Sequence, residues 1–224
     1  MKAISTIFSK LGNLFLLVSR KIYLSSLSET KGEFKRKIGD STNLDCGLDE
    51  NSVVFDVGGY EGQWASDIYS KFNSKIYVFE PVQNFADNIE KRFSKNNKIV
   101  INKFGLSDKT EMSQISLKDD SSSTINKKAD DTTEIKLVDI IDFTKQNNIT
   151  NIDLIKINIE GGEYALLNRL IGSGYIKNVK YILVQFHNFY PNAKTEMEKI
   201  RKELEKTHSP IYQFEFIWEL WKLN

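Results

Sequence analysis

Short apolar runs alternate with amphipathic stretches along most of this chain, and this alternation constrains its fold more than any other feature. The run Ser52–Val57 is typical of a strand buried on both faces of a sheet, and Gly62–Phe72 has the apolar spacing of a helix. Further strands are predicted at Lys75–Phe79, Ile99–Phe104, Glu111–Leu117, Ile152–Ile159, Tyr181–Phe186 and, from alternating aromatic residues, Tyr212–Trp218. Further helices are predicted at Val82–Phe93, Val138–Asn147, Ala193–Thr207 and from Glu163 onward. This β-α-β repetition predicts an α/β fold, with a doubly wound and mostly parallel sheet that has helices on both faces.

The composition fits one such domain with an appendage. The chain has 224 residues, of which 40% are hydrophobic and 27% charged, as is ordinary for a globular protein. Its formal net charge of +1 argues against a protein that binds nucleic acid through bulk charge. Cys46 is the single cysteine, so no internal disulfide can form and no zinc-binding spacing exists. A cytoplasmic location is therefore expected.

Residues 1–28 differ from the rest of the chain, because they carry basic side chains and no acidic one. Their apolar residues have helical spacing, but the longest unbroken run, Leu14–Val18, is too short to cross a membrane, and no signal-peptide cleavage pattern follows it. Two interpretations stay open. The segment is either a helix that packs on the domain or on a second subunit, or a basic amphipathic helix that lies on the inner face of an anionic membrane. Residues 1–50 are accordingly predicted to be an N-terminal amphipathic helix and linker, and residues 51–224 the functional domain.

The first predicted strand runs into a glycine-rich turn, Asp56-Val57-Gly58-Gly59-Tyr60-Glu61-Gly62. Ligands of doubly wound sheets bind at the carboxyl ends of the strands, where the free N–H groups of a helix that begins near Gly62 would face them. Tyr60 occupies the place of the middle glycine of a dinucleotide-binding turn, where a side chain would hinder a pyrophosphate. Asp56 would repel a pyrophosphate but suits an ammonium group. S-adenosylmethionine has an ammonium, a carboxylate and a sulfonium and no phosphate, so the turn favours this ligand.

The second predicted strand ends in Glu80-Pro81. An acid ~20 residues beyond a glycine turn is placed to accept hydrogen bonds from the two hydroxyls of a ribose. Asp56, the glycine turn and Glu80 together therefore predict a site for an adenosyl ligand.

A second polar cluster follows the strand predicted at Ile152–Ile159. Lys156, Asn158 and Glu160 alternate with isoleucines, which predicts that the three polar side chains point to the same face of the sheet. His187 ends the next predicted strand, which we expect to neighbour the Asn158 strand. A histidine at this place can act as a general base near neutral pH.

Two further readings of this region are weaker. Asn158, Glu160 and His187 offer donors for Mg²⁺ or Mn²⁺, but no spacing requires a metal ion, and none is predicted. Glu163 begins a predicted helix, where a carboxylate is favourable for structural reasons alone.

Several of these segments together resemble the FkbM-type methyltransferases. The segments that carry the resemblance are Val54–Gly62, Val78–Pro81, Gly105–Asp108 and Ile155–Glu163. It implies a seven-stranded, Rossmann-like class I methyltransferase fold, S-adenosylmethionine as the cofactor, and O-methyl transfer, often to sugars or glycolipids of surface-polysaccharide pathways. The cofactor contacts that it implies are Asp56, Gly58, Gly59, Tyr60, Gly62, Glu80, Pro81, Ser107, Asp108 and Asn158. The chain departs from the family at Tyr60, where Asn is common, and at Asn158, where Asp is frequent.

The implied reaction is an in-line attack by a hydroxyl oxygen, which requires alignment of the reactants and a base beside the oxygen. His187 is the predicted base, with Glu160 as its competitor or its orienting partner. Lys156 is expected to hold a carboxylate or phosphate of the acceptor, or to pair with Glu160. Asn158 is expected to hold the cofactor ammonium or an acceptor hydroxyl through its amide oxygen.

The predicted acceptor is a sugar hydroxyl of a nucleotide sugar, glycolipid or surface polysaccharide, and nucleic acid is not expected as a partner. Three alternatives stay open. A nucleotide-sugar oxidoreductase would need the missing middle glycine, and a nucleic-acid methyltransferase would need a basic surface or stacking aromatic residues beside Asn158. A non-catalytic, membrane-associated binding module would use residues 1–28. The polar segment Lys118–Glu134 is predicted to be a loop over the site.

Overall fold

The computed structural model describes residues 23–116, 132–188 and 192–224, which belong to two units, Met1–Asp40 and Ser41–Asn224. In the first unit, residues 23–37 form a helix. Most of the amphipathic segment of residues 1–28 lies outside the described residues. Within the described part of the chain, no helix is both long and apolar enough to cross a membrane.

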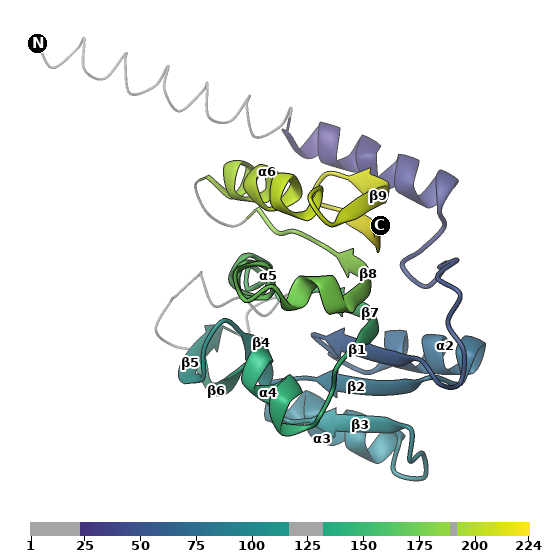
Figure 1. The fold of residues 1–224 in the computed structure, drawn as a ribbon, viewed down its shortest axis with the longest axis vertical. Coiled ribbons are helices and arrows are strands. Elements are labelled where there is room, and N and C mark those ends of the chain that lie inside the picture. Colours follow the sequence, from purple (N-terminus) through teal and green to yellow (C-terminus); the bar gives the residue numbers. More distant parts are fainter. Residues whose placement is uncertain (1–22, 117–131, 189–191) are drawn as a thin grey trace, which may run out of the picture. The chain divides into compact units, whose positions relative to one another are not determined.

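A seven-stranded sheet forms the centre of the second unit, with the strand order β3-β2-β1-β7-β8-β10-β9 (Figure 1). Its strands are β1 (Val53–Val57), β2 (Lys75–Phe79), β3 (Ile99–Asn102), β7 (Ile152–Ile157), β8 (Val179–Val184), β9 (His208–Phe214) and β10 (Trp218–Leu223). The helices are α2 (Gln63–Phe72), α3 (Gln83–Arg92), α4 (Ile140–Gln146), α5 (Glu163–Gly172), α6 (Ala193–Leu204) and the short 3₁₀ helix η1 (Tyr175–Asn178). Neighbouring strands from β3 to β8 are parallel, and β10 is antiparallel to both of its neighbours. The predicted α/β fold with a mostly parallel seven-stranded sheet is confirmed.

Side chains on the two faces of β1 show how the helices cover the sheet. Val54 belongs to an apolar cluster that includes Ala65 and Ile68 of α2 and Ile89 of α3. Phe55 points to the opposite face, because side chains alternate along a strand, and its ring lies 5.9 Å from that of Phe143 in α4. Helices therefore pack on both faces and leave the strand ends as the place for a site.

A second, three-stranded sheet was not predicted. It has the order β4-β6-β5 and consists of β4 (Gly105–Ser107), β5 (Glu111–Ser116) and β6 (Thr132–Asp139). The loop predicted at Lys118–Glu134 was wrong at its end, because Thr132–Glu134 belong to β6. The rest of that predicted loop, residues 118–131, lies outside the described residues. In Figure 1, the β1 arrow points to the side on which this sheet lies.

The end of the chain is a hairpin, and the single strand predicted at Tyr212–Trp218 was wrong. β9 ends at Phe214 and β10 begins at Trp218, with the Ile217 N–H donating to the Phe214 carbonyl across the turn. Phe216 has a positive φ of 57°, which an extended strand does not allow. The aromatic alternation continues through the turn and therefore conceals it.

Candidate active site

The glycine turn between β1 and α2 is built around the end of β7. Gly58 has a φ of 88°, and a Cβ placed on it would lie 2.0 Å from the backbone oxygen of Asn158. Both Gly58 and Gly59 donate their N–H groups to the carbonyl of Phe79 at the end of β2. Glycine is thus required at position 58 because three strand ends meet there, and Gly62, with a φ of 75°, then begins α2 without a side-chain cap.

Glu80 joins this turn to the end of β2. Its carboxylate accepts a hydrogen bond of 2.8 Å from the Tyr60 N–H through Oε2 and one of 2.8 Å from the Val82 N–H through Oε1. Burial raises the pKa of Glu80, and the two backbone hydrogen bonds oppose that shift. Each carboxylate oxygen has a further lone pair, so contact with a ribose remains a prediction that this geometry allows.

Tyr60 follows the glycine pair in a backbone conformation that suits asparagine or glycine better. Its φ is 49°, its side chain is half exposed, and its ring centre lies 4.8 Å from that of Phe85 at the start of α3. A bulky residue with a positive φ is an outlier, and such outliers cluster at functional sites. The position of Tyr60 in the turn therefore marks it as part of the candidate site.

Asp56 and Lys156 form a buried ion pair beneath the turn. They lie opposite each other on β1 and β7, and Lys156 Nζ donates to Asp56 Oδ1 at 2.8 Å and to the Gly58 carbonyl at 2.7 Å. Burial raises the pKa of the Asp56 carboxyl, and the ammonium of Lys156 opposes that shift. Lys156 thus forms its ion pair with Asp56 and not with Glu160, which was one of the predicted alternatives. Contact of its third N–H group with an acceptor anion stays a prediction.

Two oxygen atoms near these strand ends are buried without a hydrogen-bond partner among the residues that the structure describes. They are Oδ2 of Asp56 and Oδ1 of Asn158. Such atoms are rare in native proteins and often indicate a ligand or water. Both are acceptors, so the residues fit a ligand that brings N–H or O–H donors, such as the ammonium of S-adenosylmethionine.

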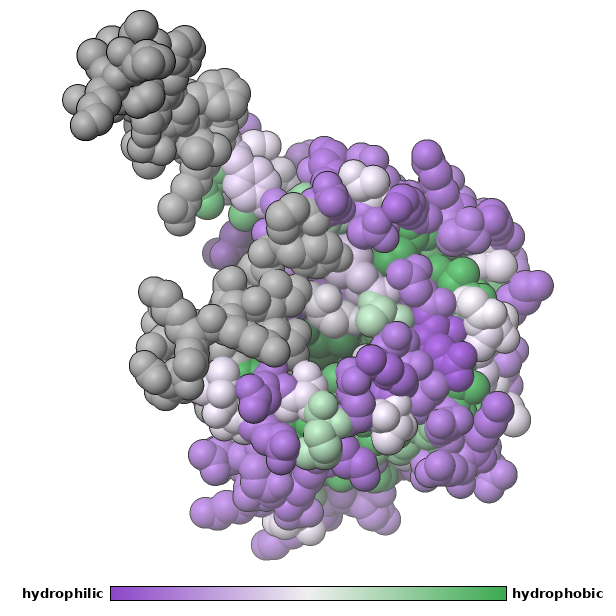
Figure 2. Space-filling model, turned by 90° about the vertical axis from the view of Figure 1, so that its left-hand side faces the viewer, coloured by the Kyte–Doolittle hydropathy of each residue, from purple (hydrophilic) through white to green (hydrophobic). Residues whose placement is uncertain are grey.

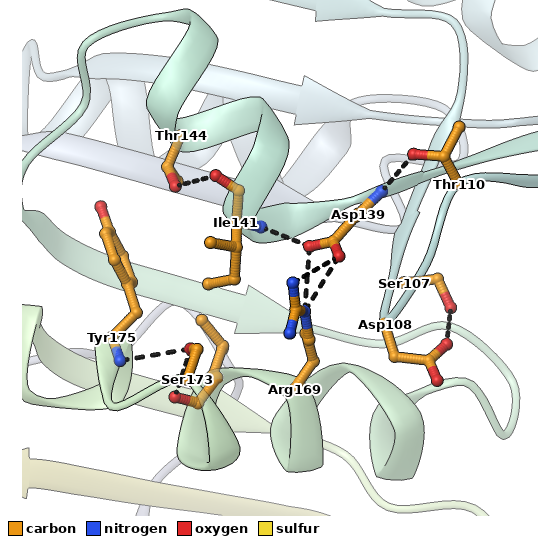
Figure 3. A network of polar contacts seen from close by, with 10 residues as sticks. Ser107, Asp108, Thr110, Asp139, Ile141, Thr144, Arg169, Ser173 and Tyr175 are labelled. Atoms are coloured by element: carbon orange, nitrogen blue, oxygen red, sulfur yellow. Dashed lines mark hydrogen bonds and ion pairs between the residues drawn. The ribbon is translucent and has the colours of Figure 1, made fainter.

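Ser107 and Asp108 lie at the end of β4 in the second sheet, and the Ser107 hydroxyl donates to the Asp108 carboxylate at 3.1 Å (Figure 3). A Cβ on Gly105 would lie 3.6 Å from Pro81, so β4 passes beside the turn that follows Glu80. The strand that leads to these two predicted cofactor contacts therefore begins beside Pro81. That they bind the cofactor remains a prediction.

Asp139 and Arg169 tie the second sheet to two helices (Figure 3). Asp139 ends β6, caps α4 by accepting from the Ile141 N–H at 2.7 Å, and accepts from Arg169 of α5 at 2.9 Å and 2.8 Å. This pair was not predicted from the sequence. The signal available was an aspartate directly before a predicted helix.

His187, beyond the end of β8, lies between two glutamates. Its Nδ1 is 2.8 Å from Glu163 Oε1, and its Nε2 is 3.5 Å from Glu160 Oε2. Burial lowers the pKa of His187, but the hydrogen bond to Glu163 and the charges of both glutamates raise it and prevail. Burial also raises the pKa of Glu160. β8 pairs with β7 as expected, so His187 lies at the same sheet edge as Asn158.

The prediction that Lys156, Asn158 and Glu160 share one face was wrong for Glu160. β7 ends at Ile157, and Glu160 has a φ of 53° in the turn before α5, so strand alternation no longer applies there. The residue that orders this turn is Glu163, which was expected to be structural only. It is fully buried and accepts from the Ile159 and Gly161 N–H groups at 2.9 Å each, besides contacting His187.

Figure 2 shows the side of the molecule to which the β1 arrow of Figure 1 points. A hollow with an apolar floor lies there among polar side chains. Among the described residues, no group of three or more His, Cys, Asp or Glu side chains is arranged to hold a metal ion.

Residues 56–212, more than half of the chain, match the Methyltransferase FkbM domain family. The chain belongs to the FkbM methyltransferase family. The match extends from Asp56 to Tyr212 and so includes all the predicted site residues, from Asp56 to His187. No curated protein matches the chain.

Several solved structures resemble this FkbM methyltransferase domain at low identity. An rRNA methylase from Streptococcus thermophilus is 12% identical with a TM-score of 0.46, over 79% of this chain and 90% of that one. A precorrin-6y C5,15-methyltransferase from Geobacter metallireducens is 11% identical with a TM-score of 0.43, over 80% of this chain and 83% of that one. TrmK from M. capricolum, in complex with S-adenosylhomocysteine, is 13% identical with a TM-score of 0.44, over 80% of this chain and 64% of that one. Family membership rests on the sequence match and not on these likenesses.

Proposed function

We propose that this FkbM methyltransferase uses S-adenosylmethionine to methylate a sugar hydroxyl of a nucleotide sugar, a glycolipid or a surface polysaccharide. The observation that carries the proposal is the position of His187. β1, β7 and β8 are neighbours, so a histidine held by a glutamate lies at the same sheet edge as the glycine turn. That edge therefore combines a candidate cofactor site with a candidate base.

The cofactor would be held by residues that the glycine turn brings together. Asp56 and Asn158 offer buried acceptor oxygens, and Glu80 offers its remaining lone pairs to a ribose. When bound, S-adenosylmethionine supplies a methyl group on a positively charged sulfur. Tyr60 stands where a dinucleotide-binding turn has its middle glycine, which disfavours the oxidoreductase alternative.

His187 would accept the proton of the acceptor hydroxyl at Nε2. Base catalysis of this kind contributes typically ~10²–10⁴-fold to a rate. Glu160 faces the same nitrogen and has a raised pKa, so the two groups are placed to share a proton. His187 could accept a proton from the acceptor only after this shared proton has been lost. The reaction should therefore be faster at higher pH.

The charges near this edge support an uncharged acceptor group. Glu80, Glu160 and Glu163 are acidic, and Lys156 is engaged by Asp56 and the Gly58 carbonyl. A phosphate next to His187 would be repelled by the negative charge of the glutamates, whereas an uncharged sugar hydroxyl would not. The choice of a sugar follows from what is typical of the family.

Methyl-labelled S-adenosylmethionine, offered with nucleotide sugars, glycolipids, polysaccharide fragments and RNA, tests the proposal. We expect the label in a sugar, as a methyl ether that survives mild alkali, and a rate about 10²–10⁴-fold lower with His187→Ala. Label transferred to RNA alone, or to a carboxyl group as an alkali-labile ester, would refute it.

A further inference from the structure

Two consecutive residues at the start of α5 hold His187 in place. Glu163 contacts the ring through Nδ1, and the Tyr164 hydroxyl donates a hydrogen bond of 2.8 Å to the backbone carbonyl of His187. Both side chains are buried. One contact fixes the ring and the other the backbone, so the first turn of α5 determines where the imidazole points.

The surroundings of Glu163 determine which ring nitrogen carries the hydrogen. Its carboxylate already accepts two backbone N–H groups, from Ile159 and Gly161, and acts only as an acceptor. The Nδ1 atom of His187 is therefore the donor in the 2.8 Å contact. A neutral ring in this tautomer has its lone pair on Nε2, the nitrogen that faces Glu160.

We infer that Glu163 is a positioning residue for methyl transfer, which keeps the hydrogen of His187 on Nδ1 and thereby directs the basic Nε2 towards Glu160 and the acceptor. The inference rests on the proposed function, in which His187 is the base. It gives Glu163 a role beyond ordering the turn between β7 and α5.

The charged groups that face the ring are Glu163 at the start of α5 and Glu160 in the preceding turn. Both raise the pKa of His187 against the effect of its burial. Replacing Glu163 by glutamine removes one of these charges and one acceptor oxygen. The pKa of His187 should then fall, and its hydrogen should no longer be confined to Nδ1.

Nitrogen NMR of the full chain with ¹⁵N-labelled histidine rings tests this directly, because the protein has only two histidines. His208 is a built-in reference for the other tautomer, since its Nε2 lies 2.9 Å from the Val179 carbonyl. The signal that disappears in His187→Ala identifies His187. At a pH above the pKa of His187, where the ring is neutral, we expect the wild-type protein to show His187 with its hydrogen on Nδ1 and His208 with its hydrogen on Nε2.

The matched variants are Glu163→Gln and, as a control, Glu203→Gln, which changes an acid of α6 that is paired with Lys206 at the surface. In Glu163→Gln we expect a changed His187 tautomer, a lower His187 pKa and a kcat reduced about tenfold or more, with unchanged affinity for S-adenosylhomocysteine. Glu203→Gln should change none of these.

A neutral wild-type His187 with its hydrogen on Nε2 would overturn the inference, and this measurement stands even if Glu163→Gln does not fold. An unchanged tautomer and pKa in a folded Glu163→Gln would overturn it as well, because Glu163 would then only order the turn. Failure of the proposed function has a different signature: His187→Ala would keep its turnover whatever the tautomer.

Discussion

Asp56 and Lys156 show how the sheet register determines the chemistry of single residues. They are 100 positions apart in sequence, yet the pairing of β1 with β7 places them side by side in the protein interior. From the sequence, Asp56 was predicted to bind the ammonium group of a ligand. One of its oxygens already has an ammonium from its own chain, and only the other is left for a ligand.

Asp56→Ala should therefore destabilise the fold as well as weaken cofactor binding. It would leave Lys156 buried without its carboxylate, and loss of one partner of a buried ion pair typically costs about 3–5 kcal/mol. Urea denaturation should show this loss, and Asp56→Ala/Lys156→Met should recover part of it. If the losses of unfolding free energy in Asp56→Ala and in Lys156→Met simply add up in the double variant, the two residues do not interact energetically.

His187→Ala should lower kcat by about 10²–10⁴-fold and leave S-adenosylhomocysteine affinity unchanged, since a base acts mainly in the transition state. In the wild-type protein the rate should rise with pH through a pKa above the ordinary histidine value, because Glu163 and Glu160 stabilise the protonated ring. A kcat–pH profile measures both effects. Turnover in His187→Ala that equals the wild type would mean that the histidine is structural.

At the scale of elements, the buried strands were predictable, whereas β4, β6 and the terminal hairpin were not. β1, β2 and β7 are continuous apolar runs, and their positions were predicted to within a few residues. β4 has only three residues, and β6 follows a polar segment, so neither has a clear apolar pattern. The terminal hairpin was missed because its aromatic alternation passes through the turn at Phe216.

The candidate site was predictable in part for the same reason. Strand ends could be read from the sequence, and they supplied Asp56, Glu80 and His187. The pairs Lys156–Asp56 and Glu163–His187 could not be read, because they depend on strand register and on the turn before α5.

Asp139→Ala should loosen the connection between the second sheet and the helices. The variant removes the cap of α4, which is worth about 0.5–2 kcal/mol, and leaves Arg169 without its carboxylate. We expect the free energy of unfolding to fall by about 1–3 kcal/mol in urea denaturation. Glu198→Ala, which changes an exposed acid of α6, is the control and should change it by less than about 0.5 kcal/mol. Equal effects of the two substitutions would contradict this role of Asp139.

At the scale of the whole molecule, the site belongs to the second unit. Every predicted cofactor residue lies between Asp56 and Asn158, within Ser41–Asn224 and within the family match. Membrane contact or self-association through the first unit stays a prediction.

A chain that begins at Ser41 should bind S-adenosylhomocysteine as tightly as the full chain. Liposome flotation and light scattering on the two forms should show a loss of membrane binding or of oligomers in the shorter one. No change in either would indicate that residues 1–40 only pack against their own domain. Loss of cofactor affinity would contradict the separation of the two units.

Calorimetric titration with S-adenosylhomocysteine and with NAD tests the central claim most directly. Wild-type protein should bind S-adenosylhomocysteine and not NAD. Glu80→Gln should weaken that binding by about 1.5–3 kcal/mol, the typical worth of a hydrogen bond to a charged group, while the exposed Glu90→Gln on α3 should not. Binding of NAD, or an affinity for S-adenosylhomocysteine that is the same in Glu80→Gln as in the wild type, would contradict the account.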